Sequence, residues 1–199
     1  MQDETEGKNR LIEVLSNRFP EEATELGTLL HHAYQAGTIT YDDINLDPTT
    51  KEDIILIASQ ARMVVPLGTA PAWEDRVLMF DSHETYHMPK VVRILVQMAE
   101  EEGKWQPETA EDQCLREAGE PNISKVLNYL SMIKTISPDC RISLEVMDSL
   151  RGELGISLQF HKLLDELVQC GIMSTYSRKS LFRGTPQYEV NASLYWAAP

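Results

Sequence analysis

The 199-residue sequence predicts a mainly helical fold with small β-hairpins, which is the α+β class. Apolar residues recur every three or four positions over much of the chain, as they do on the buried face of an amphipathic helix. Glycines and prolines separate these stretches and mark where helices begin or end. Near the C-terminus the stretch 188–191 instead alternates apolar and polar residues, which is typical of a half-buried strand.

The first 45 residues predict two helices and one further helical turn. The first helix is indicated by apolar residues at helical spacing, namely Leu11, Val14, Leu15 and Phe19. Pro20 suits the start of a second helix, because a first-turn residue needs no intrahelical amide bond, and Gly37 ends it. We expect a structural role for His31 at the edge of its apolar face. The stretch 38–45 then has room for one short turn of helix.

The next forty residues predict a capped helix, a loop and a strand. Asp47 precedes Pro48 and two threonines, which is the composition of a helix cap. The apolar face of this helix consists of Ile54, Ile57, Ala58 and Ala61. A loop rich in proline and glycine follows at 66–71, and the apolar run at 76–80 predicts a strand.

The middle of the chain predicts one strong helix and a polar stretch. Pro89 begins the helix, whose apolar face contains Val91, Ile94, Leu95 and Met98. The polar stretch at 104–120 includes one predicted helix at 109–118. Two interpretations of this stretch stay open, either a linker between modules or a helix laid across their junction.

The last third predicts three helices joined by tight turns. The first begins at Ile123 and ends at Ser137, which a proline follows. Ser143 caps the second helix. Gly155 makes the turn into the third, which carries five apolar residues on one face, Phe160, Leu163, Leu164, Leu167 and Val168. Gly171 ends the third helix.

A β-hairpin is predicted after these helices. Its strands are expected at 172–177 and 188–191, with a turn-rich tip at 179–186 between them. Three helices followed by a hairpin give this part of the chain a mixed helical and β character.

This last third resembles the winged-helix family, whose three helices are followed by a hairpin called the wing. The resemblance covers about seventy residues. It is strongest over Leu144–Met173, with Leu-Gly-Ile-Ser at the turn and Glu-Leu-Val-Gln-Cys-Gly-Ile-Met at the exit of the third helix. The order of elements before residue 82 also resembles that family. We therefore expect an acidic, winged-helix-like domain at 1–85, a connecting helix and polar linker at 86–121, and a winged-helix domain at 122–199.

The net charge of −13 is unevenly distributed along the chain. Residues 1–85 hold 16 acidic and 6 basic side chains, a balance of −10, whereas residues 141–199 are balanced with 6 of each. Because DNA binding depends on neutralising phosphates, only the C-terminal third is expected to meet DNA without repulsion.

Other features of composition narrow the function classes. The three cysteines are far apart and form no C-x-x-C pair, which favours buried thiols in a cytoplasmic protein. No apolar run approaches the roughly 20 residues of a membrane helix, so we expect no membrane partner. The sequence has neither a glycine-rich phosphate loop nor a nucleophilic serine elbow. We therefore predict no cofactor and no catalytic residue.

One enzyme-like motif is present. His83-Glu84-Thr85-Tyr86-His87 matches H-E-x-x-H, which on a helix places two zinc-binding histidines on one face and a general-base glutamate beside them. Pro89 follows the second histidine by two residues and disfavours a helix there. We expect a junction loop, with His83 and His87 as weak metal candidates and a zinc-dependent hydrolase as the remote alternative.

The winged-helix resemblance implies a set of contact residues on the third helix and the wing. These are Ser157, Gln159, Lys162, Arg178, Lys179, Leu181, Phe182 and Arg183. Ser157, Gln159 and Lys162 would face a major groove, and the wing cations Arg178, Lys179 and Arg183 would contact phosphates. The apolar pair Leu181-Phe182 would enter a minor groove, fill a protein pocket or pack on its own core. Asp165 and Glu166 are expected to project outward beside Lys162 and to repel phosphate, so the wing is the better contact surface.

Besides the remote hydrolase alternative, two functions follow from these observations. The favoured hypothesis is a DNA-associated regulator whose C-terminal module binds double-stranded DNA, while the acidic N-terminal part forms a homodimer or contacts a partner. The alternative is a tandem winged-helix adaptor that binds protein and no DNA.

Overall fold

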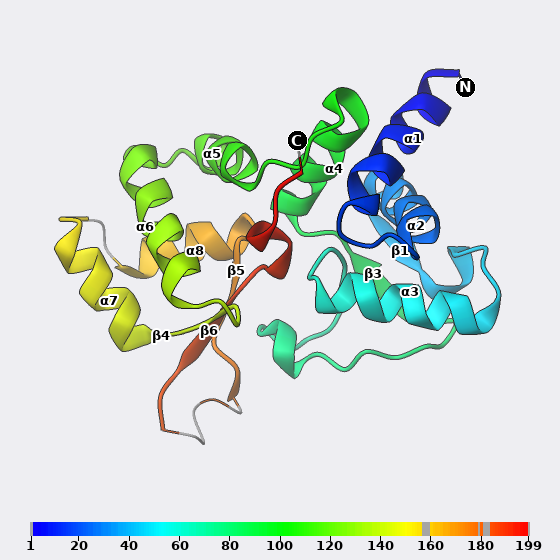
Figure 1. Ribbon diagram of the computed structural model, residues 1–199. Coiled ribbons are helices and arrows are strands. Elements are labelled where there is room, and N and C mark those ends of the chain that lie inside the picture. The colour runs from blue at the N-terminus through cyan, green and yellow to red at the C-terminus, as the bar shows by residue number, and fades with distance from the viewer. Residues whose placement is uncertain (1, 157–159, 179, 181–183, 199) are drawn as a thin grey trace.

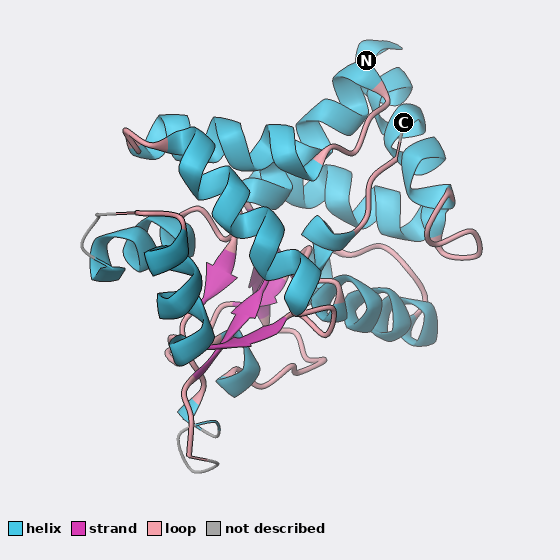
Figure 2. Cartoon of the chain, turned by 60° about the vertical axis from the view of Figure 1, so that its left-hand side comes forward, coloured by secondary structure: helices cyan, strands magenta, loops and turns pink. Residues whose placement is uncertain are grey.

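The computed structural model describes residues 2–156, 160–178, 180 and 184–198 (Figure 1). Within these residues helices dominate, and two small antiparallel sheets of three strands lie among them (Figure 2). The predicted α+β class is therefore confirmed. Within the described part of the chain, no helix combines the length and the apolar character that a membrane crossing requires.

The first sheet belongs to an N-terminal module. Its elements are α2 (Ala23–Ala36), β1 (Thr38–Thr40), η1 (Tyr41–Asp43), α3 (Pro48–Gln60), β2 (Val65–Pro66), η2 (Trp73–Asp75) and β3 (Thr85–His87). The strand order is β1-β3-β2, so β3 lies in the middle and His87 is aligned with both Thr38 and Val65. We call residues 67–84, which connect β2 to β3, the N-terminal wing.

The second sheet belongs to a C-terminal module with the same order of elements. Its elements are α6 (Ile123–Ile136), β4 (Arg141–Ser143), α7 (Leu144–Glu153), α8 (Phe160–Gln169), β5 (Met173–Ser174) and β6 (Gln187–Val190). The strand order is β4-β6-β5, again with the last strand in the middle. In both modules a helix and a strand precede two helical segments, and two strands follow them. Helix α3 in the first module thus corresponds in order to α8 in the second.

Three further helices and the C-terminal segment join the modules. Helix α1 (Gln2–Ser16) packs on α2 and α4 (Lys90–Glu102), and α5 (Pro107–Ala118) contacts α4, α6, α8 and η3 (Ala192–Tyr195). The polar stretch 104–120 thus contains the helix α5, which lies against elements of the C-terminal module as well as against α4. The chain end returns to this junction (Figure 1), where Trp105 and Ala198 exchange two backbone hydrogen bonds of 3.1 and 3.0 Å.

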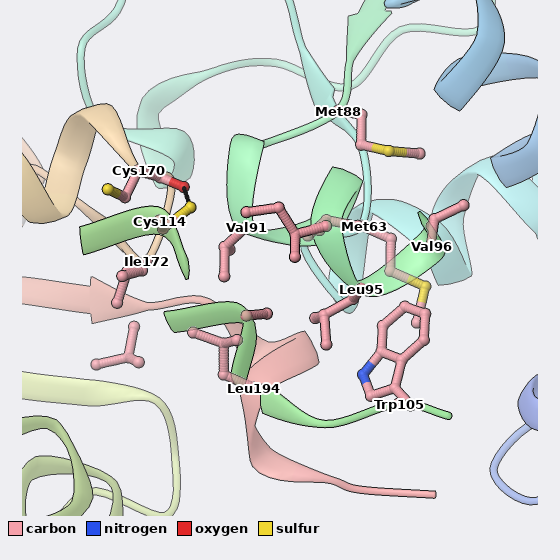
Figure 3. Packing of buried hydrophobic residues seen from close by; sticks show 14 of the residues in the cluster. Met63, Met88, Val91, Leu95, Val96, Trp105, Cys114, Cys170, Ile172 and Leu194 are labelled. Atoms are coloured by element: carbon pink, nitrogen blue, oxygen red, sulfur yellow. Dashed lines mark hydrogen bonds between the residues drawn. The ribbon is translucent and has the colours of Figure 1, made fainter. Parts of the chain in front are cut away.

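One hydrophobic core runs through both modules. Figure 3 shows Met63 before β2, Met88 after β3, Ile172 before β5 and Leu194 of η3, with side chains of α4 between them. The expected domain boundary after residue 85 falls inside β3, because this strand spans Thr85–His87.

The predicted helix ends are confirmed at several positions. Asp47 accepts a hydrogen bond from the amide of Thr50, and Ser143 accepts one from Val146. Gly171 follows α8 with a φ of 69°, and a Cβ atom added there would lie 2.6 Å from Cβ of Pro89. The glycine therefore provides both the left-handed turn and the space in which α4 begins against α8.

The predicted strand at 76–80 is wrong. This stretch belongs to no sheet, and Val77, Met79 and Phe80 expose 70%, 45% and 38% of their surface. The central strand is instead the shorter β3, whose Tyr86 is fully buried and donates its hydroxyl proton to the carbonyl of Met79. A short apolar run has the sequence pattern of a buried strand even when it forms no hydrogen bonds to another strand. Here the run lies on the surface of the N-terminal wing.

Candidate functional site

The structure describes two of the eight predicted contact residues, Lys162 and Arg178. The other six lie outside the described residues, and they are Ser157, Gln159, Lys179, Leu181, Phe182 and Arg183. The DNA-contact surface implied by the winged-helix resemblance therefore stays a prediction at most of its positions. The charge on the described parts of both modules nevertheless indicates whether their surfaces favour DNA or protein as a partner.

The exposed face of α8 offers little positive charge in its described part. Lys162 is exposed, but its Nζ lies 3.6 Å from Oε1 of Glu166, and the neighbouring Asp165 is exposed as well. Glu166 does not project outward as predicted, because only 7% of its surface is exposed. Its carboxyl group lies beside that of Glu120, which is also buried. Burial and the neighbouring Glu120 raise the pKa of Glu166.

We call the predicted hairpin tip at 179–186 the C-terminal wing. The residues just before it, Ser177 and Arg178, are hydrogen-bonded to the N-terminal wing. Asp75 accepts hydrogen bonds of 2.8 Å from both the hydroxyl of Ser177 and the backbone amide of Arg178. The amide of Trp73 donates to Oγ of Ser174 over 2.9 Å. A carboxylate thus lies at the foot of the predicted DNA-binding wing, and it weakens the positive potential that a phosphate would meet there.

A second set of contacts fastens α3 to the C-terminal sheet. Nε of Arg62, just after α3, lies 2.6 Å from Oε1 of Glu189 on β6. The fully buried Asn191 donates to the carbonyls of Arg62 and Gly171 over 3.1 and 3.0 Å. Its own Oδ1 accepts from the amide and the hydroxyl of Ser193. These bonds fix the orientation of α3 relative to the second module.

Helix α3 exposes acidic and apolar side chains. Glu52, Asp53 and Leu56 face solvent, with 40% of Leu56 exposed. The cation of this helix, Lys51, folds back onto Tyr41, since its Nζ lies 3.2 Å from that residue's carbonyl oxygen and 4.5 Å from the centre of its ring. This exposed face was not predicted from the sequence. The signal for it was Leu56, an apolar residue that falls outside the predicted buried face of the helix.

The N-terminal wing adds further exposed apolar surface. Besides Val77, Met79 and Phe80, Leu67 at the start of the wing is 60% exposed. Arg76 holds the loop from inside, because its guanidinium donates to the carbonyls of Pro66 and Ala70. The wing is thus internally fixed while its apolar side chains face outward, and such surfaces are typical of protein contacts.

The H-E-x-x-H motif does not form the helical metal site that its spacing requires. Residues 85–87 are a strand, and His83 lies in an exposed turn before it. His87 is half-buried, and burial together with the nearby Arg76 lowers the pKa of its imidazole. Among the described residues, no group of three histidine, cysteine, aspartate or glutamate side chains could hold a metal ion.

His31 has the kind of contact that a structural role requires. Its Nδ1 lies 2.7 Å from Oε1 of Glu100, a mostly buried carboxylate of α4. Nε of Arg10 donates to the backbone carbonyl of Glu100. These three residues join α1, α2 and α4, away from the exposed face of α3.

Comparison with known proteins gives a family and no described relative. Neither the curated proteins nor the solved structures contain a match to this chain. A protein-family model matches residues 9–197, which is nearly the whole sequence. The chain therefore belongs to the family that this model represents.

Proposed function

We propose that this protein is a tandem winged-helix adaptor that binds another protein through its N-terminal module. The observation that carries the proposal is the exposed face of α3. In DNA-binding winged helices, the last helix before the hairpin enters the major groove, and α3 has that position in the N-terminal module. Here it presents Glu52, Asp53 and Leu56, and two carboxylates facing phosphates would oppose binding.

Two further observations support the same choice. The described face of α8 pairs its cation Lys162 with Glu166 and leaves Asp165 exposed. The N-terminal wing exposes four large apolar side chains, and a partner protein would gain by covering them. The adaptor that the sequence left as an alternative is thus favoured over the DNA-associated regulator. The three cysteines are free thiols, which suits a cytoplasmic location.

Two measurements on the full chain test the adaptor function. In the first, a fluorescent DNA duplex is titrated at low ionic strength. We expect no binding up to about 10 μM protein, although non-specific DNA-binding proteins often associate in or near that range. Binding that weakens steeply with salt would contradict the proposal.

In the second measurement, a photo-cross-linking amino acid replaces Leu56 in cells of the source organism. The control places the same group at Val146 on α7, which is 42% exposed against 40% for Leu56. We expect one protein to be cross-linked at position 56 and not at 146. Equal cross-linking at both positions, or none at 56, would contradict the adaptor function.

A further inference from the structure

Two adjoining clefts lie along α3. One cleft, with a volume of about 350 Å³, is lined by Glu21, Glu22, Glu25, Thr50, Asp53, Ile54, Leu56 and Ile57. A second, of about 470 Å³, is lined by Arg18, Phe19, Glu22, Ile57, Gln60, Ala61, Ala192 and Trp196. The two clefts adjoin at Glu22 and Ile57, which line both, and we call the pair of clefts the α2–α3 groove.

The two ends of the groove differ in chemistry. At the first end Glu21, Glu25 and Asp53 surround an apolar floor. Within the described part of the chain, none of these three carboxylates lies within ion-pair distance of a cation. At the second end, the rings of Phe19 and Trp196 meet edge to face with their centres 6.2 Å apart. The first end of the groove therefore combines unpaired negative charge with apolar surface, and the second end combines apolar surface with the cation Arg18.

Helix stabilisation explains part of this acidity. Glu25 lies in the first turn of α2, Glu22 is its N-cap residue and Glu21 precedes it, and carboxylates near a helix N-terminus interact favourably with the helix dipole. Asp53 lies in the middle of α3, and the exposed Leu56 gains nothing from that effect. These two side chains border the same cleft as the glutamates. Stabilisation of α2 and α3 therefore does not explain why an aspartate and an exposed leucine lie in this cleft.

The length of the groove along α3 matches about three turns of a helix. Its lining on α3 runs from Thr50 to Ala61, which is about 17 Å at 1.5 Å per residue, or three helical turns. Amphipathic helices bind such grooves through apolar side chains spaced at i, i+3 or i+4, and i+7. The excess charge of −10 over residues 1–85 selects for a partner of positive charge.

We infer that the α2–α3 groove binds a basic amphipathic helix of about three turns from a partner protein. The apolar side of that helix covers Leu56 and Ile57 and reaches the Phe19–Trp196 pair, while its lysines or arginines face Glu21, Glu25 and Asp53. This inference rests on the proposed adaptor function and adds the chemistry of the partner segment.

The test uses three fluorescent peptides of about 14 residues, which span roughly four helical turns. The first is an amphipathic helix of leucine, alanine and lysine. The second has glutamate at every lysine position, and the third has the composition of the first in a non-amphipathic order. Binding to the full chain is followed by fluorescence anisotropy at low and moderate ionic strength. We expect the first peptide to bind at least about tenfold more tightly than the other two.

Charge-reversal and apolar variants locate the binding. Asp53→Lys should weaken binding of the basic peptide about fivefold, and Glu25→Lys combined with Asp53→Lys about twentyfold. The charge control is Glu153→Lys, on an exposed residue at the end of α7. Leu56→Asp should weaken binding about tenfold, and its control is Val146→Asp at a site of similar exposure. Both controls should stay within about twofold of the unsubstituted protein. Circular dichroism checks that every variant is folded.

The outcomes separate this inference from the proposed function. Three outcomes would overturn the basic-helix inference. They are equal binding of the three peptides, equal weakening by the groove and control variants, and no binding up to about 1 mM. If cross-linking at position 56 still captured a partner protein, the adaptor function would stand and only the class of its partner segment would change.

Discussion

Asn191 offers a quantitative test of how the two modules are joined. The side chain is fully buried and takes part in four hydrogen bonds, two donated to the carbonyls of Arg62 and Gly171 and two accepted from Ser193. Replacing it with alanine removes all four and leaves buried polar groups without their partner. Each such group costs about 1–3 kcal/mol, with some relaxation through water. For Asn191→Ala we therefore expect a loss of about 3–5 kcal/mol in the free energy of unfolding.

The isosteric variant Asn191→Asp separates hydrogen bonding from packing. The aspartate keeps the shape and both acceptor bonds to Ser193, but it turns an oxygen toward the carbonyls of Arg62 and Gly171. At pH 7 it should destabilise the protein about as much as alanine does. These carbonyls and the burial should raise the pKa of the new carboxyl group above its unfolded value. The aspartate variant should therefore gain stability relative to the alanine variant as the pH falls, because its protonated form can donate again.

Equilibrium unfolding in urea, followed by circular dichroism, measures these differences on the full chain. A matched control is Asn17→Ala, since Asn17 is exposed and its amide donates only to nearby backbone carbonyls. The control should change the free energy of unfolding by less than about 0.5 kcal/mol. If Asn191→Ala also stayed within about 1 kcal/mol of the parent, our explanation of the module junction would be refuted.

Three further predictions concern buried charges and the joined wings. Lys134→Met should lower the free energy of unfolding by about 3–5 kcal/mol, because it leaves the carboxylate of Glu111, which is 1% exposed, without its ammonium partner. Adding Glu111→Leu should recover most of this loss, measured by urea unfolding of both single variants and the double variant. Glu166→Gln should stabilise the protein at pH 7, since burial and Glu120 raise the pKa of Glu166 in the folded state. Unfolding at several pH values should show this gain disappearing below about pH 4, where the parent side chain becomes protonated in both states. Asp75→Ala should cost about 1–2 kcal/mol and speed amide hydrogen exchange at the foot of the C-terminal wing, measured by mass spectrometry, with exchange in α1 as the control.

Local sequence signals accounted for the helices well. Asp47 and Ser143 cap helices by side-chain hydrogen bonds, and Gly37 and Gly171 end helices with positive φ angles. Such signals work because they depend on atoms within a few residues of each other. The turn chemistry was therefore readable without any knowledge of the partners in space.

The strands and the groove depend on distant partners and were harder to predict. Strands β1 and β4 have three residues each and bury one, Ile39 and Ile142, which is too short for a recognisable alternation. The buried position of Glu166 also depends on a distant residue, Glu120. The α2–α3 groove joins residues near positions 20, 55 and 195, which only the folded chain brings together.

A charge reversal on α3, measured with two probes, tests most directly whether this face binds protein. The lysine-containing peptide and a DNA duplex are each titrated against the parent protein and Asp53→Lys at low ionic strength. We expect the parent to bind the peptide and not the duplex, and the reversal to weaken peptide binding about fivefold. Duplex binding by the parent that weakens with salt, together with peptide binding that ignores the reversal, would contradict a protein-binding acidic face on α3.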